Sequence, residues 1–196
     1  NKLIDRLAIS LIELGLKRDD LVVLQLPNCA ELLLMRIACE RAGLLNLPVL
    51  RTLRHTEMQH ILKYTGARVV VIHWKYRDFD HFEMIQELKS GLPELKHIII
   101  WGEEVPGKTI SLKELLSNPV EDKYPPDYLE SKKIPPLNLS TINLTTGTTG
   151  LPKFVEWPTC SFVITGVLVD RLNLTHEDIC GSFTGTALGP NVIAFY

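Results

Sequence analysis

Val69-Val70-Val71-Ile72 is the stretch that decides the fold, because four consecutive aliphatic residues without polar alternation predict a strand buried on both faces. Similar apolar runs lie before and after it, at Leu21–Leu26 and at His97–Trp101. Segments with helical periodicity separate these runs, near residues 30–42, 56–64 and 82–88. This alternation of strand and helix predicts an α/β fold, with a doubly wound and mostly parallel sheet flanked by helices.

Two segments depart from this pattern. Residues 44–50 form another short extended run, in which Pro48 predicts an edge or irregular strand because proline donates no ladder hydrogen bond. Residues 119–136 contain five of the chain's 12 prolines, a density that excludes both a helix and a central strand. We therefore expect an α/β portion over residues 1–118, a connecting segment over 119–137, and a portion over 138–196 that holds a strand, a loop and the start of a further α/β unit. Both ends of the chain interrupt an apolar pattern, so we expect a piece of a longer protein.

Net charge and cysteine usage argue against several classes of protein. With 21 basic and 23 acidic residues the formal net charge is -2, so the chain lacks the dense basic stripe of a nucleic-acid-binding protein. No run approaches the roughly 18–20 apolar residues of a membrane span. The four cysteines are scattered without a CxxC pair, and neither they nor the six histidines show metal-ligand spacing. These features predict reduced thiols, no membrane span and a cytoplasmic location.

A threonine- and glycine-rich loop follows a short strand predicted at residues 141–144, and it reads Thr145-Thr146-Gly147-Thr148-Thr149-Gly150-Leu151-Pro152-Lys153. The threonines place hydroxyl donors beside the backbone, and the glycines let that backbone turn and approach a ligand closely. Consecutive N–H groups in such a bend form a concavity that favours anions. Lys153 adds a mobile cation. Hydroxyls, amides and an ammonium together indicate a site for the oxygens of a polyphosphate and of departing pyrophosphate.

The alternative for this loop is a plain turn between two strands with an exposed lysine, and the length and order of its nine residues favour the polyphosphate site. The loop is not a Walker loop, in which lysine directly follows the last glycine. Here Leu151 and Pro152 intervene, and Phe154 stands where a Walker loop has a hydroxyl residue.

The segment from Ile142 to Lys153, INLTTGTTGLPK, resembles the signature phosphate loop of the adenylate-forming enzymes, the family of acyl- and aryl-CoA synthetases, luciferases and peptide-synthetase adenylation domains. Leu14–Val22, LGLKRDDLV, is similar to the family's LGLxxGDxV segment, with Asp19 where glycine is common. Thr65–Val69, TGARV, is similar to the segment that leads the family's next strand. The resemblance covers nearly the whole chain.

The resemblance implies part of the large N-terminal domain of an enzyme that uses ATP with Mg²⁺ to convert a carboxylic acid to an acyl- or aryl-adenylate, with release of pyrophosphate. A thiol, of CoA or of a carrier protein, then displaces AMP. The resemblance also implies nucleotide contacts for seven residues of the loop, with Lys153 acting in catalysis: Thr145, Thr146, Gly147, Thr148, Thr149, Gly150 and Lys153. The family's ribose-binding aspartate and C-terminal lysine are not in this chain, so we expect the 196 residues of this chain not to catalyse the reaction by themselves.

Within the family, the 2,3-dihydroxybenzoate-AMP ligases are the nearest type, as Leu26-Pro27-Asn28 and Arg54-His55 indicate. Asn191 stands near the position at which aryl-acid ligases have a His-Asn pair beside the substrate carboxylate, which makes it a candidate substrate-binding residue. Pro190 stands where the histidine is expected. A helix cap is the alternative role for Asn191. The alternative enzyme is a fatty-acyl or other acyl-CoA synthetase, and the alternative of another class is a non-catalytic nucleotide-binding module.

Overall fold

The computed structural model describes residues 1–145, 150–163, 167, 170–173, 175 and 177–178 of the chain. The α-helices in these residues are α1 (Lys2–Glu13), α2 (Ala30–Arg41), α3 (His55–Thr65), α4 (His81–Leu88) and α5 (Leu112–Ser117). The strands are β1 (Leu21–Gln25), β2 (Leu45–Pro48), β3 (Val69–His73), β4 (Lys75–Tyr76), β5 (Phe79–Asp80), β6 (His97–Trp101), β7 (Ile110–Ser111), β8 (Leu139–Leu144) and β9 (Phe154–Pro158). Short 3₁₀ helices occur at η1 (Lys89–Gly91), η2 (Val120–Lys123), η3 (Glu130–Lys132) and η4 (Thr159–Val163).

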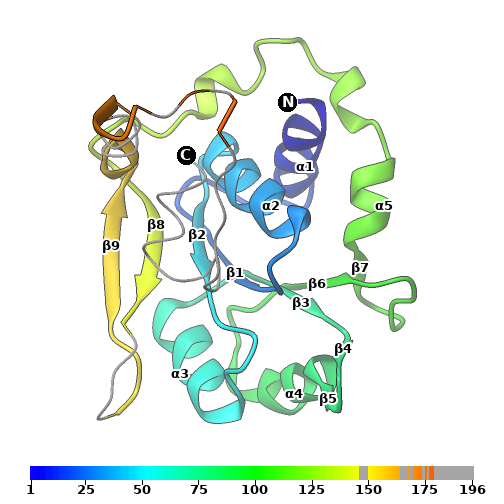
Figure 1. Ribbon diagram of the computed structural model, residues 1–196. Coiled ribbons are helices and arrows are strands. Elements are labelled where there is room, and N and C mark those ends of the chain that lie inside the picture. Colours follow the sequence, from blue (N-terminus) through cyan, green and yellow to red (C-terminus); the bar gives the residue numbers. More distant parts are fainter. Residues whose placement is uncertain (146–149, 164–166, 168–169, 174, 176, 179–196) are drawn as a thin grey trace.

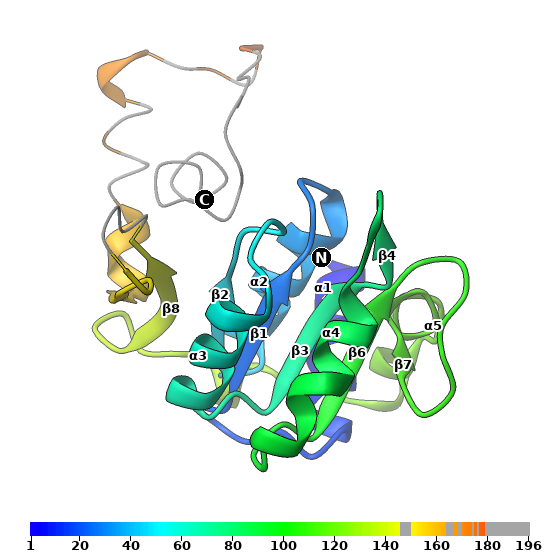
Figure 2. The same cartoon turned by 90° about the horizontal axis from the view of Figure 1, so that it is seen from below.

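Seven of the described strands form one sheet, in the order β7-β6-β3-β1-β2-β8-β9. Each pair of neighbours from β7 to β8 is parallel, whereas β8 and β9 are antiparallel. Helices cover both faces: α1, α2 and α5 lie on one side of the sheet and α3 and α4 on the other (Figures 1 and 2). The predicted α/β fold with a mostly parallel, helix-flanked sheet is therefore confirmed.

The core has two halves because successive side chains of a strand point to opposite faces of the sheet. Val69 and Val71 of β3 pack in the cluster beneath α1 and α2, whereas Val70 and Ile72 pack in the cluster beneath α3 and α4. All four are fully buried. Burying one such side chain contributes about 1.5–3 kcal/mol relative to leaving it exposed. A run without polar alternation is thus the pattern required of a strand with helices on both faces.

Of the two alternatives predicted for the strand containing Pro48, an edge strand or an irregular strand, the edge position is wrong. β2 lies inside the sheet, with β1 on one side and β8 on the other. Pro48 is the last residue of β2 and stands opposite Leu24 of β1. The next residue, Val49, donates its N–H to the carbonyl of Leu24 at 2.9 Å. The missing proline donor therefore falls at the end of the ladder, where an interior strand tolerates it.

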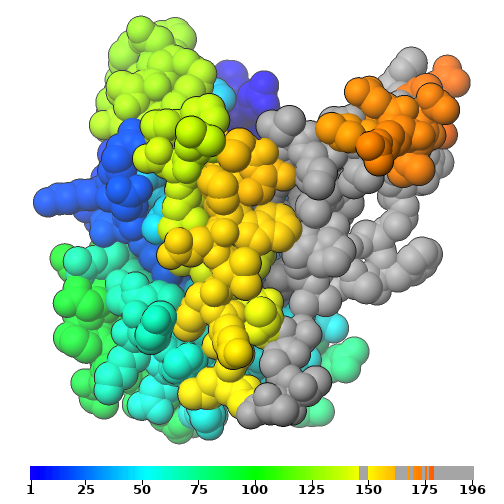
Figure 3. All heavy atoms as spheres, turned by 90° about the vertical axis from the view of Figure 1, so that its left-hand side faces the viewer, coloured from blue at the N-terminus to red at the C-terminus, as the bar shows by residue number. Residues whose placement is uncertain are grey.

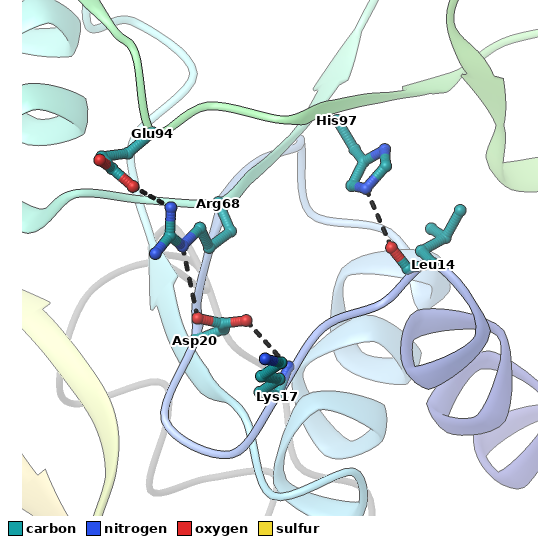
Figure 4. Close-up of polar contacts among 6 residues, drawn as sticks. All are labelled: Leu14, Lys17, Asp20, Arg68, Glu94 and His97. Atoms are coloured by element: carbon teal, nitrogen blue, oxygen red, sulfur yellow. Dashed lines mark hydrogen bonds and ion pairs between the residues drawn. The ribbon is translucent and has the colours of Figure 1, made fainter.

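An ion-pair network ties the amino ends of the central strands together (Figure 4). The Nε of Arg68, the residue before β3, lies 3.4 Å from Oδ1 of Asp20, and its Nη1 pairs with Glu94. The other carboxylate oxygen of Asp20 accepts the backbone N–H of Lys17 at 2.8 Å. Asp20 and Arg68 belong to the LGLKRDDLV and TGARV segments, so these two similar stretches contact each other in space.

The proline-rich segment is fixed to the helical layer at two points. Arg6 of α1 makes a bidentate contact with Glu121 of η2, at 2.6 Å and 2.9 Å, and only 15% and 10% of the two side chains remain exposed. Gly43 has a φ of +76°, and a Cβ at this position would lie 2.7 Å from the carbonyl oxygen of Lys132. Only glycine fits this approach without strain. The proposed division of the chain after residues 118 and 137 stays a prediction.

Two further findings concern the environment of the chain. In the part of the chain that the structure describes, no helix is long and apolar enough to cross a membrane. Cys29, Cys39 and Cys160 are free thiols, as expected. Cys39 is fully buried in the core, and burial raises the pKa of the half-buried Cys29 thiol to about 11. Cys29 and Cys39 are therefore protonated at neutral pH and behave as small apolar side chains.

Candidate functional site

The threonine- and glycine-rich loop connects the two strands of the β8–β9 hairpin. Leu144 and Phe154 stand opposite each other in its ladder. One step beyond this pair, the N–H of Thr145 donates to the carbonyl of Lys153 at 2.9 Å, and the N–H of Lys153 donates to Oγ1 of Thr145 at 3.2 Å. Thr145 thus closes the neck of the loop with both its backbone and its hydroxyl. The strand predicted at residues 141–144 is confirmed as part of β8.

Most of the described residues of the loop are exposed to solvent. Thr145, Gly150 and Lys153 are all exposed. Among the described residues, no carboxylate lies within ion-pair distance of Lys153, so its ammonium is available to an anion. An exposed ammonium beside a closed hairpin neck suits a phosphate ligand, because it adds charge to hydroxyl and amide donors.

Five of the residues predicted for the site lie outside the described residues: Thr146, Gly147, Thr148, Thr149 and Asn191. Residues 179–196, at the end of the portion expected over 138–196, lie outside them as well. Of the further α/β unit expected over residues 138–196, the structure describes the short 3₁₀ helix η4 after β9. The roles of all the predicted site residues stay predictions.

Asn46 joins the hairpin to the rest of the sheet. In the register of β2 and β8, Asn46 stands opposite Thr141. Its side chain is fully buried, and Nδ2 donates to the carbonyl of Ser140 at 3.1 Å and to Oγ1 of Thr141 at 3.0 Å. Asn46 is thus a buried polar residue that the sequence reasoning missed. An Asn inside an otherwise apolar run is the signal that could have identified it. Such a residue is buried with its neighbours, and buried amides have hydrogen-bond partners.

The loop leaves the sheet at the carboxyl end of β8, next to the carboxyl end of the parallel strand β2. In open α/β sheets this edge is where ligands bind. Two guanidinium groups follow β2 at the same edge: Arg51 lies over the ring of Tyr76 at 4.4 Å, and Arg54 lies over the ring of Phe79 at 3.9 Å. They add positive charge to the edge at which a polyphosphate would be held.

A pocket of about 460 Å³ opens further along this edge, at the carboxyl ends of β3 and β6. Its lining includes His73, Trp101, Glu31 of α2 and Lys113 of α5, and none of the loop residues that the structure describes. The His73 and Trp101 rings meet edge to face, with centroids 4.9 Å apart. Burial lowers the pKa of His73, so its imidazole is neutral at pH 7. The sequence reasoning assigned nothing to this pocket.

The model of the family described as AMP-binding enzyme matches residues 1–185. The chain belongs to this family. Membership in the AMP-binding enzymes agrees with the resemblance of the phosphate loop and of the flanking segments. Asp19 now has a physical explanation. It stands where glycine is common in the family pattern, and its φ is +67°, a left-handed conformation that glycine adopts without strain.

Two AMP-binding relatives illustrate the range of the similarity. The 2-hydroxy-7-methoxy-5-methyl-1-naphthoate–CoA ligase of Streptomyces carzinostaticus is 31% identical over 153 residues, which are 77% of this chain and 27% of that protein. The 2,3-dihydroxybenzoate-AMP ligase of Bacillus subtilis (strain 168) is 32% identical over 154 residues, which are 77% of this chain and 26% of that protein. The chain therefore spans about a quarter of the length of these relatives.

A solved structure shares the fold. The long-chain-fatty-acid-CoA ligase from Archaeoglobus fulgidus superposes with a TM-score of 0.78 at 19% identity, over 99% of this chain and 36% of that one. The architecture of the AMP-binding enzymes thus extends over the described sheet and its helices.

Proposed function

We propose that this chain is part of an enzyme that activates a carboxylic acid with ATP. The acid attacks the α-phosphate, an acyl- or aryl-adenylate forms, and pyrophosphate leaves; a thiol of CoA or of a carrier protein then displaces AMP. The observation that carries this proposal is the exposed Lys153 at the closed neck of the loop, in a chain of the AMP-binding family.

The chemistry of the loop supports this assignment. Negative charge grows on pyrophosphate as it leaves, and donors fixed in advance at that position stabilise the transition state more than the bound substrate. Lys153 would supply a cation, and the hydroxyls and amides of Thr145–Gly150 would supply neutral donors. Mg²⁺ would arrive with the nucleotide and neutralise part of the phosphate charge. The free thiols of Cys29, Cys39 and Cys160 support a reducing, cytoplasmic location.

For the acid, we propose an aryl carboxylate of the 2,3-dihydroxybenzoate type, with Asn191 beside the carboxylate. The similarity to two aryl-acid ligases supports this choice. One observation favours a fatty-acyl or other acyl substrate instead: Pro190 stands where the aryl-acid pattern has histidine. A non-catalytic module that binds a nucleotide through the same loop is the alternative of another class.

Binding of inorganic pyrophosphate and of ATP with Mg²⁺ to the chain, measured by titration calorimetry, tests the role of the loop. We expect Lys153→Ala to weaken binding by roughly 10- to 100-fold, because a charge-assisted hydrogen bond contributes about 1.5–3 kcal/mol. Lys96→Ala is the matched control, since Lys96 is also exposed but lies at the amino end of β6, on the opposite edge of the sheet. Equal affinities for the two variants would contradict the assignment of Lys153.

Carboxylate-dependent exchange between ATP and pyrophosphate in the longer protein tests the activity. A panel of 2,3-dihydroxybenzoate, salicylate and fatty acids of increasing length separates the aryl from the acyl alternative. We expect exchange with an aryl acid, and we expect Lys153→Ala to reduce it. Nucleotide binding without exchange for every acid in the panel would favour the non-catalytic module.

A further inference from the structure

Three aromatic rings meet on the flank of the hairpin that carries the loop. Tyr64 of α3 stacks on Phe154, the first residue of β9, with centroids 4.9 Å apart and planes inclined by 3°. His60, one helical turn before Tyr64, lies 5.7 Å from the Tyr64 ring and 5.6 Å from the Phe154 ring. These separations fall within the range in which aromatic pairs attract each other. Figure 3 shows β9 (yellow) on the surface of the molecule beside α3 (cyan).

Tyr64 is not a core residue. It is 73% exposed, whereas its neighbours Ile61 and Leu62 on the same helix are buried. Tyr64 and Phe154 both line a pocket of about 280 Å³ between α3 and the hairpin. Asp20 and Arg68, which the ion-pair network of Figure 4 fixes, line the same pocket. The stacked rings thus bridge α3 and β9 beside a hollow.

Phe154 is covalently next to Lys153, the cation of the loop. The backbone of Lys153 is held from the other strand by Thr145, through the two hydrogen bonds at the neck. Phe154 and its partner Leu144 pack against the core on the α3 side of the sheet. Because neighbouring side chains of an extended chain point to opposite faces, a rotation of Phe154 about the strand would carry Lys153 with it. The rings of His60 and Tyr64 oppose that rotation.

We propose that Tyr64 and His60 are positioning residues for the phosphate loop: they clamp Phe154 and thereby fix the direction in which Lys153 presents its ammonium. This inference rests on the proposed function, since it assigns Lys153 to a phosphate ligand. The ring of Tyr64 carries the effect, and its hydroxyl is not needed. The clamp joins an exposed residue of α3 to a loop that lies about 90 residues later in the chain.

The first test needs no ligand. Hydrogen exchange of the Lys153 amide, followed by NMR on the full chain, reports how firmly the neck is closed. We expect exchange to be about three- to tenfold faster in Tyr64→Ala, because the loss of one aromatic pair of about 0.5–1.5 kcal/mol corresponds to that range. Tyr64→Phe keeps the ring and should exchange as the unmodified chain does. Gln59→Ala is the control, because Gln59 is an exposed, non-aromatic residue of the same helix.

The second test measures affinity for inorganic pyrophosphate. We expect Tyr64→Ala to weaken binding about threefold or more and Tyr64→Phe to change it less than about twofold. On a Lys153→Ala background, Tyr64→Ala should cause no further loss, since the clamp acts through Lys153. Tyr64→Ala should lower the midpoint of urea unfolding by less than about 1 M, because the lost ring pair contributes only about 0.5–1.5 kcal/mol. The variant therefore stays folded in the binding measurement, so a loss of affinity reports positioning and not unfolding.

Two results would overturn the inference. One is an unchanged rate of hydrogen exchange at the Lys153 amide in Tyr64→Ala. The other is that Tyr64→Ala weakens pyrophosphate binding equally in the presence and in the absence of the Lys153 side chain. Failure of the proposed function gives a different pattern. In that case the unmodified chain does not bind pyrophosphate, while Tyr64→Ala still accelerates exchange of the Lys153 amide.

Discussion

Replacement of Asn46 should loosen the hairpin that carries the loop. The Asn46 amide is fully buried and donates one hydrogen bond to the Ser140 carbonyl and one to the Thr141 hydroxyl, at 3.1 Å and 3.0 Å. In Asn46→Ala both donors are lost, and each lost bond costs about 1 kcal/mol net. Any acceptor left without another partner in the interior adds up to about 2 kcal/mol. We expect a total of roughly 2–4 kcal/mol, a large part of the ~5–15 kcal/mol that stabilises a typical domain.

Urea unfolding followed by circular dichroism measures this change. With a slope of about 2–3 kcal/mol per molar for a chain of this size, the midpoint should fall by roughly 1 M. Asn138→Ala is the matched control, since Asn138 is an exposed residue just before β8, and it should change stability by no more than about 0.5 kcal/mol.

Asn46→Asp sharpens the test because it keeps the shape of the side chain but replaces the donor NH₂ group with an acceptor oxygen. At neutral pH it places a carboxylate in a fully buried position facing the Ser140 carbonyl. It should therefore destabilise more than Asn46→Ala. As the pH falls and the carboxyl is protonated, it regains a donor, and the difference from the unmodified chain should shrink. A loss below about 1 kcal/mol for Asn46→Ala, or the same stability for the alanine and aspartate variants at pH 7, would refute the reasoning.

Two further predictions concern stability. Asp19→Gly should raise the free energy of unfolding by up to about 1 kcal/mol, because Asp19 has a φ of +67° that glycine adopts without strain. Asp19→Ala should give no such gain in stability. Urea unfolding of the two variants measures the difference. Hydrogen bonding to Arg6 lowers the pKa of Glu121, so this contact stabilises the chain above the unfolded pKa of about 4.3 and is lost as the pH falls through the lower folded pKa. Glu121→Gln should therefore be less stable than the unmodified chain at pH 7. Unfolding curves measured over a series of pH values should show that this difference in the free energy of unfolding decreases in acid. A difference that stays constant with pH would show that the carboxylate charge plays no part.

The parts of the fold that were predictable from the sequence depend on local signals. Val69–Ile72 predicted a strand buried on both faces, and β3 has helices on both sides. The loop from Thr145 to Lys153 was identified from residue types alone, because its hydroxyl, amide and ammonium groups come from residues that are consecutive in the sequence. The edge position expected for the strand with Pro48 failed, because the neighbours of a strand are set by segments far away in the chain. Here β8 supplies the second neighbour, about 90 residues later.

The candidate site also has features that were predictable from the sequence and features that were not. The sequence by itself determined the family and the alternation of strands and helices, and it predicted the residues that would bind a polyphosphate. Only the tertiary structure decided that Thr145 closes the neck on Lys153, that Asn46 anchors the hairpin to β2, and that the ring of Tyr64 stacks on Phe154. The physical reason is that propensity, periodicity and turn chemistry act between residues close in sequence. Buried hydrogen bonds and ring contacts, in contrast, join residues that only the folded sheet brings within 3 to 5 Å of each other.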